Sequence, residues 1–83
     1  MIDLEHWQTQ YWYKSENRRF YRVELHQDLF GNWLLTRTWG SAYKLGQQVS
    51  ECLDTWEDGL VVLQRIRKQR AAKHYQPQPE KRA

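Results

Sequence analysis

Residues 20–41 have the sequence FYRVELHQDLFGNWLLTRTWGS, and this stretch decides the fold. In its first part, Tyr21, Val23 and Leu25 fall on one side of an extended chain, with polar residues between them. Alternation with a period of two is typical of an antiparallel strand that has one face in the core and the other in water. The pattern therefore predicts a half-buried strand over residues 20–28.

The residues that follow complete a hairpin. Phe30, Gly31 and Asn32 predict a turn, because glycine and asparagine both tolerate positive φ. Residues 33–39 are rich in β-branched and aromatic side chains, and they predict the returning strand.

Two flanking segments extend this hairpin into a sheet. HWQTQYWYK at residues 6–14 and GQQVSECL at residues 46–53 each predict a further strand, and Val49 in the second is expected to face inward. We therefore expect a small antiparallel sheet of about four strands.

The hydrophobic period changes after residue 53. Asp54 or Thr55 can cap the N-terminus of a helix, and apolar residues then recur at spacings typical of one helix face. The members of this apolar stripe are Trp56, Leu60, Leu63 and Ile66. Gly59 allows the helix to approach the sheet closely. The chain is thus predicted to be an α+β domain in which one long helix packs on one face of the sheet.

The length of 83 residues suits one small domain. We expect an N-terminal segment over residues 1–10, a folded domain over 11–76, and a disordered basic tail over 77–83, which prolines interrupt. The N-terminus does not resemble a signal peptide, and no segment approaches the roughly 20 apolar residues of a membrane span. The single cysteine, Cys52, fits a reducing compartment, so we expect a bacterial cytoplasmic protein.

Charge is distributed unevenly along the chain. The formal net charge is +3, but the chain from Val62 onward carries seven bases against one acid, a net +6. Residues 1–61 carry six bases against nine acids, a net −3. This asymmetry indicates either an element that faces a polyanion or a solvated basic face of the helix.

Motifs of catalysis and metal binding are missing from the sequence. There is no phosphate-binding glycine loop, no dinucleotide-binding glycine motif and no nucleophile elbow. No pair among the three histidines and Cys52 has the spacing of zinc ligands. Glu24, His26 and Asp28 share one strand face, which we interpret as the solvated side of that strand rather than an acid–base cluster. We expect no enzymatic activity, no metal and no cofactor.

Several short motifs resemble the WGR domain, named for Trp-Gly-Arg, and above all its short stand-alone bacterial members. They are Tyr-Arg-Val at 21–23, Asp-Leu-Phe-Gly at 28–31, Arg-Thr-Trp-Gly at 37–40, Gly-Gln-Gln at 46–48, and Tyr75 after the helix. The resemblance covers residues 11–76. It implies an antiparallel sheet with one helix, in agreement with the hydrophobic pattern, and it implies nucleic-acid binding.

The resemblance also implies roles for particular residues. In DNA-dependent poly(ADP-ribose) polymerases the motif tryptophan stacks on a terminal nucleotide at a DNA break. By position, Trp39 would be the stacking residue, Arg37 a backbone contact, and Asn17 would lie near an Asn-Lys pair of the family. This sequence departs from the family in carrying Ser41 where the motif has arginine, and His74 where the family has glycine before its tyrosine.

Trp39 has two interpretations that the sequence leaves open. Its ring either closes the core between sheet and helix, as large aromatics in small domains commonly do, or it is a platform on which a base stacks. In the second case, lysine and arginine side chains near Trp39 would neutralise phosphates in a sequence-independent complex with DNA ends or DNA backbone. The nucleic-acid-binding residues expected on this hypothesis are Trp39, Arg37, Lys44, Asn17, Arg18, Arg19, Arg67, Lys68 and Arg70.

The alternative is a protein-interaction adaptor, or a homodimerising module, that has lost DNA binding. Exposed aromatics such as Trp7, Trp12 or Tyr43 would then form a contact patch. We expect a monomer or a weak homodimer, with DNA and possibly a protein as partners and no membrane association.

Overall fold

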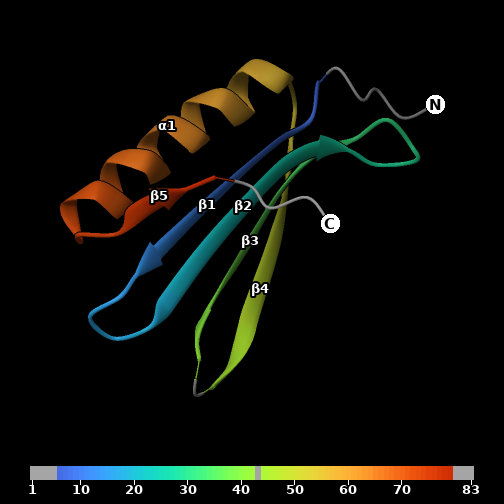
Figure 1. The fold of residues 1–83 in the computed structure, drawn as a ribbon. Coiled ribbons are helices and arrows are strands. Elements are labelled where there is room, and N and C mark those ends of the chain that lie inside the picture. Colours follow the sequence, from blue (N-terminus) through green and yellow to red (C-terminus); the bar gives the residue numbers. More distant parts are fainter. Residues whose placement is uncertain (1–5, 43, 80–83) are drawn as a thin grey trace.

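The computed structural model describes residues 6–42 and 44–79, which form one five-stranded sheet and one helix. The elements in chain order are β1 (Gln8–Lys14), β2 (Arg19–Gln27), β3 (Trp33–Ser41), β4 (Lys44–Leu53), α1 (Trp56–Ala72) and β5 (Gln76–Gln78). The strands lie in the order β4-β3-β2-β1-β5, and every neighbouring pair is antiparallel. The helix lies against one face of this sheet (Figure 1). The predicted α+β class is confirmed, with one strand more than expected.

The additional strand, β5, includes the first two residues of the segment that is predicted to be a disordered tail. Residues 76–78 pair with β1, where Pro77 lies opposite Trp12. Proline is tolerated here because β5 is an edge strand, on which the missing N–H costs no ladder hydrogen bond. The sheet therefore includes residues 77 and 78, and at the other end it includes residues 8–10. Residues 80–83 of the predicted tail lie outside the described residues.

A left-handed residue allows the chain to turn from α1 into β5. His74 has a φ of 65°, and the N–H of Tyr75 donates to the carbonyl oxygen of Arg70 at 3.0 Å. This bond closes the end of the helix in the pattern of a Schellman motif, for which glycine is the usual residue. His74 thus adopts a left-handed conformation that glycine takes at lower cost.

The alternation in β2 is confirmed. Tyr21, Val23 and Leu25 are buried and face the helix, where they meet Leu35 of β3. The pairing of β1 with β2 shows which aromatic residue of β1 is buried. Trp12 pairs with Tyr21 and is only 3% exposed, so it belongs to the core and cannot contribute to an exposed contact patch, contrary to expectation.

The helix has a capped N-terminus and approaches the sheet closely at one glycine. The N–H of Asp58 donates to Oγ1 of Thr55 at 3.1 Å, as expected for an N-cap. A Cβ at Gly59 would lie 2.5 Å from Cδ1 of Leu25, so a larger residue at this position would have to displace the buried Leu25 side chain. Leu63 and Ile66 continue the buried stripe. None of the described helix residues forms a segment long and apolar enough to span a membrane.

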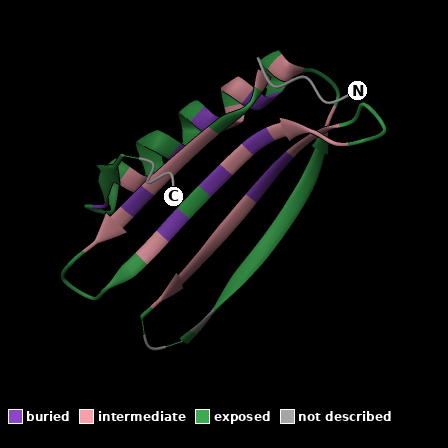
Figure 2. Cartoon of the chain, turned by 45° about the vertical axis from the view of Figure 1, so that its right-hand side comes forward, coloured by how far each residue is buried: buried purple, intermediate pink, exposed green. Residues whose placement is uncertain are grey.

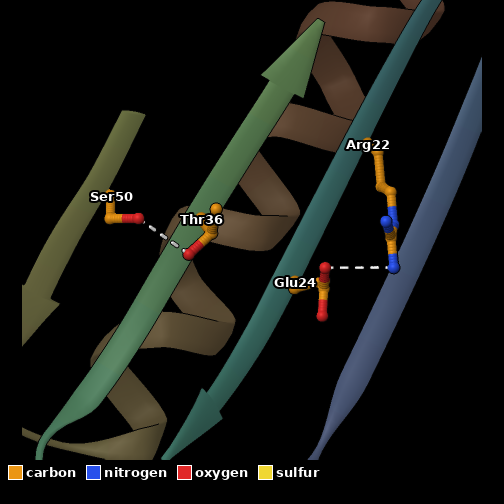
Figure 3. A network of polar contacts seen from close by, with 4 residues as sticks. All are labelled: Arg22, Glu24, Thr36 and Ser50. Atoms are coloured by element: carbon orange, nitrogen blue, oxygen red, sulfur yellow. Dashed lines mark hydrogen bonds and ion pairs between the residues drawn. The ribbon is translucent and has the colours of Figure 1, made fainter. Parts of the chain in front are cut away.

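The other face of the sheet carries polar contacts instead of a second layer. The hydroxyls of Thr36 and Ser50 share a hydrogen bond of 2.9 Å, and Arg22 pairs with Glu24 at 3.0 Å (Figure 3). Buried positions concentrate on β1, β2, β3 and the helix, whereas β4 is almost wholly exposed (Figure 2). The helix-bearing side of the sheet is therefore the side on which a core forms.

The turn between β2 and β3 is ordered by the carboxylate of Asp28. Its Oδ1 accepts hydrogen bonds from the backbone N–H groups of Phe30 and Asn32, each at 2.9 Å, and Gly31 has a φ of 87°. The hydrogen bond from the Asn32 backbone is the main reason that the pKa of Asp28 lies below its ordinary value. The charged carboxylate is therefore the form that stabilises the turn.

This shift predicts how the stability of the domain depends on pH. A depressed carboxylate pKa contributes stability that is fully present above the ordinary value of about 4 and is lost as the pH falls through the lower folded-state pKa. We expect Asp28→Asn to make the free energy of unfolding less dependent on pH below about pH 4. Urea unfolding at a series of pH values measures this, with Asp54→Asn as a control of equal charge change. An unchanged pH dependence in Asp28→Asn would contradict the assignment.

Candidate nucleic-acid interface

Helix α1 starts next to the end of β4 and then diverges from the rest of that strand (Figure 1). The second half of β3 and the first half of β4 are therefore left uncovered on the helix side. Val49 shows the effect, because it faces this side but is 53% exposed. The expectation that Val49 faces a core was wrong, since the helix does not reach it.

A groove occupies this uncovered region. It has a volume of about 590 Å³ and is bounded by the end of α1, the turn between β1 and β2, and the strands β3 and β4. Its polar lining includes Asn17 and a single acid, Glu51. The basic residues that line it are Lys14, Arg19, Arg37, Arg70 and Lys73. Bases from both halves of the chain thus converge on one site.

Aromatic rings hold the charged head of Arg70 in the groove. Its Cζ lies 4.2 Å from the ring centre of Tyr21 and 4.9 Å from that of Tyr75, and Lys14 Nζ lies 5.9 Å from the centre of the Tyr75 ring. Contacts of a guanidinium with ring faces are attractive but leave its N–H groups available to an anion. The Nε of Arg70 is buried and has no hydrogen-bond partner among the described residues.

Trp39 also lines the groove. Its ring is stacked on Tyr21, with centroids 6.0 Å apart and an interplanar angle of 17°. The side chain is half-buried, packs against the core with that side, and lines the groove with the rest. The two interpretations of Trp39 are therefore compatible, because one ring can border the core and still offer surface to a ligand.

The residue after Trp39 must be small for local packing reasons. A Cβ at Gly40 would lie 2.9 Å from Cα of Gly46 and 3.1 Å from the ring of Phe20. Strand β3 is also out of regular register with β4 between Trp39 and Ser41. A second hollow adjoins the groove here, and Trp39, Ser41 and Lys44 line it together.

The family model of the WGR domain matches residues 5–82 of the chain. The chain belongs to the WGR-domain family. No match was found among curated proteins or among solved structures. The match confirms the family resemblance inferred from the sequence motifs. The WGR family is a family of nucleic-acid-binding modules.

Most of the residues predicted for the WGR-domain interface come together in the structure. Trp39, Arg37, Asn17, Arg19 and Arg70 line the groove. Lys44 lines the adjoining hollow, where it lies opposite Ser41 in the strand ladder. A basic side chain is therefore present next to the position at which the family motif has arginine.

Three predicted residues lie outside the lining of both hollows. Arg18 is in the turn between β1 and β2 and accepts the N–H of Ala42 with its carbonyl oxygen at 3.1 Å. Arg67 Nη2 donates to Oε1 of Gln10 at 3.2 Å. Lys68 lies on the outer surface of the helix, beside Leu60 and other residues of that surface.

The sequence analysis did not assign seven residues of the groove lining to the site, namely Lys14, Tyr21, Leu35, Val49, Glu51, Lys73 and Tyr75. Tyr75 is one of the residues that carry the family resemblance, and the hydrophobic pattern predicts Tyr21 in the core, where it also lies. Lys14 and Lys73 carry no local signal, since neither has a motif around it. Among residues 6–42 and 44–79, no three His, Cys, Asp or Glu side chains are placed to hold a metal ion.

Proposed function

We propose that this WGR-domain protein binds DNA at strand ends or along the backbone, without reading a long sequence, and that the groove is the binding surface. The observation that carries the proposal is that five lysine and arginine side chains line the same groove as the half-exposed ring of Trp39. Lysine and arginine side chains neutralise phosphates and release their counterions. A flat ring beside them adds stacking with a base or sugar.

The size and shape of the groove support this function. Its volume of about 590 Å³ lies within the range of sites that hold small molecules, so it suits one or two nucleotides rather than a whole duplex. Tyr21 occupies one side of the Trp39 ring, so a nucleotide can stack only on the other side. Lys44 lies close enough to the motif position of Ser41 to supply the charge that the missing arginine would carry.

The direct test is a titration of labelled DNA at two salt concentrations. The panel comprises blunt duplexes, nicked duplexes, duplexes with 5′-phosphorylated ends, and single strands. We expect binding at low salt that favours DNA with ends or nicks over an equal length of uninterrupted duplex. Absence of binding to every member at low salt would contradict the proposal.

Substitution of groove lysines should change the salt dependence of binding. We expect Lys14→Gln and Lys73→Gln each to weaken binding and to flatten the log–log salt slope by about 0.9 for each duplex phosphate that the variant no longer neutralises. Lys68→Gln is the matched control, because it removes the same charge from the outer surface of the helix. Fluorescence anisotropy over a salt series measures the slopes. A slope that flattens equally in Lys68→Gln would place the interface on the helix instead.

A protein-interaction role is the second candidate, and one observation favours it. Leu29 and Phe30 are 74% and 89% exposed at the tip of the turn that Asp28 orders. Rigidly presented apolar side chains are typical anchors in protein interfaces. Trp7 is 40% exposed, and Tyr43 lies outside the described residues. Sedimentation of the wild type and of Phe30→Ser over a range of concentrations tests the homodimer form of this role.

A further inference from the structure

Glu51 is the exception in a groove that is otherwise suited to phosphate. It is the one acid in the lining, and Arg37 Nη2 donates to its Oε1 at 3.0 Å. The two side chains are 33% and 44% exposed, and ion pairs this exposed contribute little to folding stability. The carboxylate of Glu51 offsets the charge of Arg37, so this pair adds no net positive charge that would attract a phosphate. This part of the groove is therefore less suited to phosphate than the rest of the lining, and it offers a hydrogen-bond acceptor to a ligand.

The groove has two chemically different walls. One wall carries four basic side chains, which come from β1, the start of β2 and the end of α1. They are Lys14, Arg19, Arg70 and Lys73. The other wall is formed by β3 and β4, where Arg37 lies opposite Val49 in the ladder and Trp39 lies two residues further along. It combines a flat ring, an apolar side chain and the Arg37–Glu51 pair. A nucleotide lying across the groove would place its phosphate against the first wall and its base against the second.

The Arg37–Glu51 pair offers both hydrogen-bond donors and an acceptor to the edge of a base. Arginine pairs with the O6 and N7 acceptors of guanine, and a carboxylate has two oxygens that accept hydrogen bonds. Guanine complements such a carboxylate best, because its N1–H and N2–H donors are adjacent and point in the same direction. These donors are engaged by cytosine inside a duplex, so only an unpaired guanine can present them.

We propose that Glu51 determines specificity in the groove by selecting an unpaired guanine at a strand end. The base would stack on Trp39, its donor edge would meet the Glu51 carboxylate, and its phosphate would lie on the basic wall. This inference rests on the proposed function and adds to it a preference that backbone binding alone does not produce. The preference concerns one terminal nucleotide, and the rest of the strand is bound without regard to sequence.

The experiment compares short thymidine strands that end in one guanine, adenine, cytosine or thymine, with the variable base at either terminus. We expect the guanine-ended strand to bind roughly 5- to 150-fold more tightly than the others at the preferred terminus, as a bidentate base contact allows. Free GMP serves as a competitor, and we expect it to bind more weakly than the strand. Equal binding of GMP and the strand would overturn the assignment to a strand end.

Two variants separate a specific contact from a general charge effect. Glu51→Gln should abolish the preference for guanine and should raise the affinity for the thymine-ended strand, because the charge of Arg37 is then no longer offset. Glu24→Gln breaks a comparable pair with Arg22 on the opposite face of the sheet, and it should leave both properties unchanged.

Each remaining outcome decides between the two proposals. Equal binding of all four strands by the wild type, or a guanine preference that survives in Glu51→Gln, overturns the inference about Glu51 and leaves the proposed function intact. Absence of binding to every strand and duplex overturns both.

Discussion

Replacement of Trp39 by alanine is expected to weaken DNA binding by roughly 5- to 150-fold, which corresponds to a loss of about 1–3 kcal/mol for one base that no longer stacks. The expectation follows from the position of the ring, which is stacked on Tyr21 with one side and borders the basic groove with the rest. Trp39→Phe keeps a flat ring and should retain most of the affinity. Anisotropy titrations at fixed salt measure the differences.

A control is needed because Trp39 also packs against the core. Trp33→Ala removes the same side chain from the other end of β3, where the ring is also half-buried and its centre lies 5.5 Å from that of Trp56. Both variants should lose stability, and only Trp39→Ala should lose affinity when each is measured well below its unfolding temperature. Equal losses of affinity in the two variants would show that Trp39 acts through folding alone.

Replacement of Leu25 by alanine is expected to lower the free energy of unfolding by about 2–5 kcal/mol. Leu25 is fully buried in β2, and the helix approaches it through Gly59, where a Cβ would lie 2.5 Å from it. Truncation leaves a cavity between sheet and helix that neither element can close, because both are held by their own hydrogen bonds. In a domain of this size the melting temperature should fall by about 10 °C or more.

Leu34→Ala is the matched comparison for Leu25→Ala. Leu34 lies on the neighbouring strand and is only half-buried on the face without a helix, so its truncation should cost much less. Urea unfolding followed by tryptophan fluorescence measures both variants. A loss in Leu34→Ala as large as that in Leu25→Ala would contradict the placement of the core on the helix side alone.

Local patterns predicted the strands and the helix because these elements depend on interactions between residues close in sequence. The alternation of Tyr21, Val23 and Leu25 decides which side of β2 is buried, and the cap at Thr55 decides where the helix begins. Strand β5 escaped prediction because its pairing with β1 is made by residues more than sixty positions apart. Its own sequence contains proline and carries no strand signal.

The candidate site was predictable only in part, and for a similar reason. Trp39 and Arg37 belong to a family motif, and their place at the end of β3 follows from the hairpin. The basic residues in the second half of the helix, by contrast, lie on different sides of the helix. Arg70 enters the groove, whereas Arg67 reaches Gln10 and Lys68 lies on the outer surface. Helical periodicity does not say where the sheet leaves room for a ligand.

The sequence by itself determined the α+β class, the central hairpin, the buried stripe of the helix and membership of the WGR family. Only the tertiary structure decided that the helix diverges from β3 and β4, and that Lys14, Arg19 and Arg37 meet Arg70 and Lys73 in the space this opens. The physical reason is that periodicity reports the environment of each element separately. The crossing of helix and sheet depends on contacts between distant residues, above all the approach of Gly59 to Leu25.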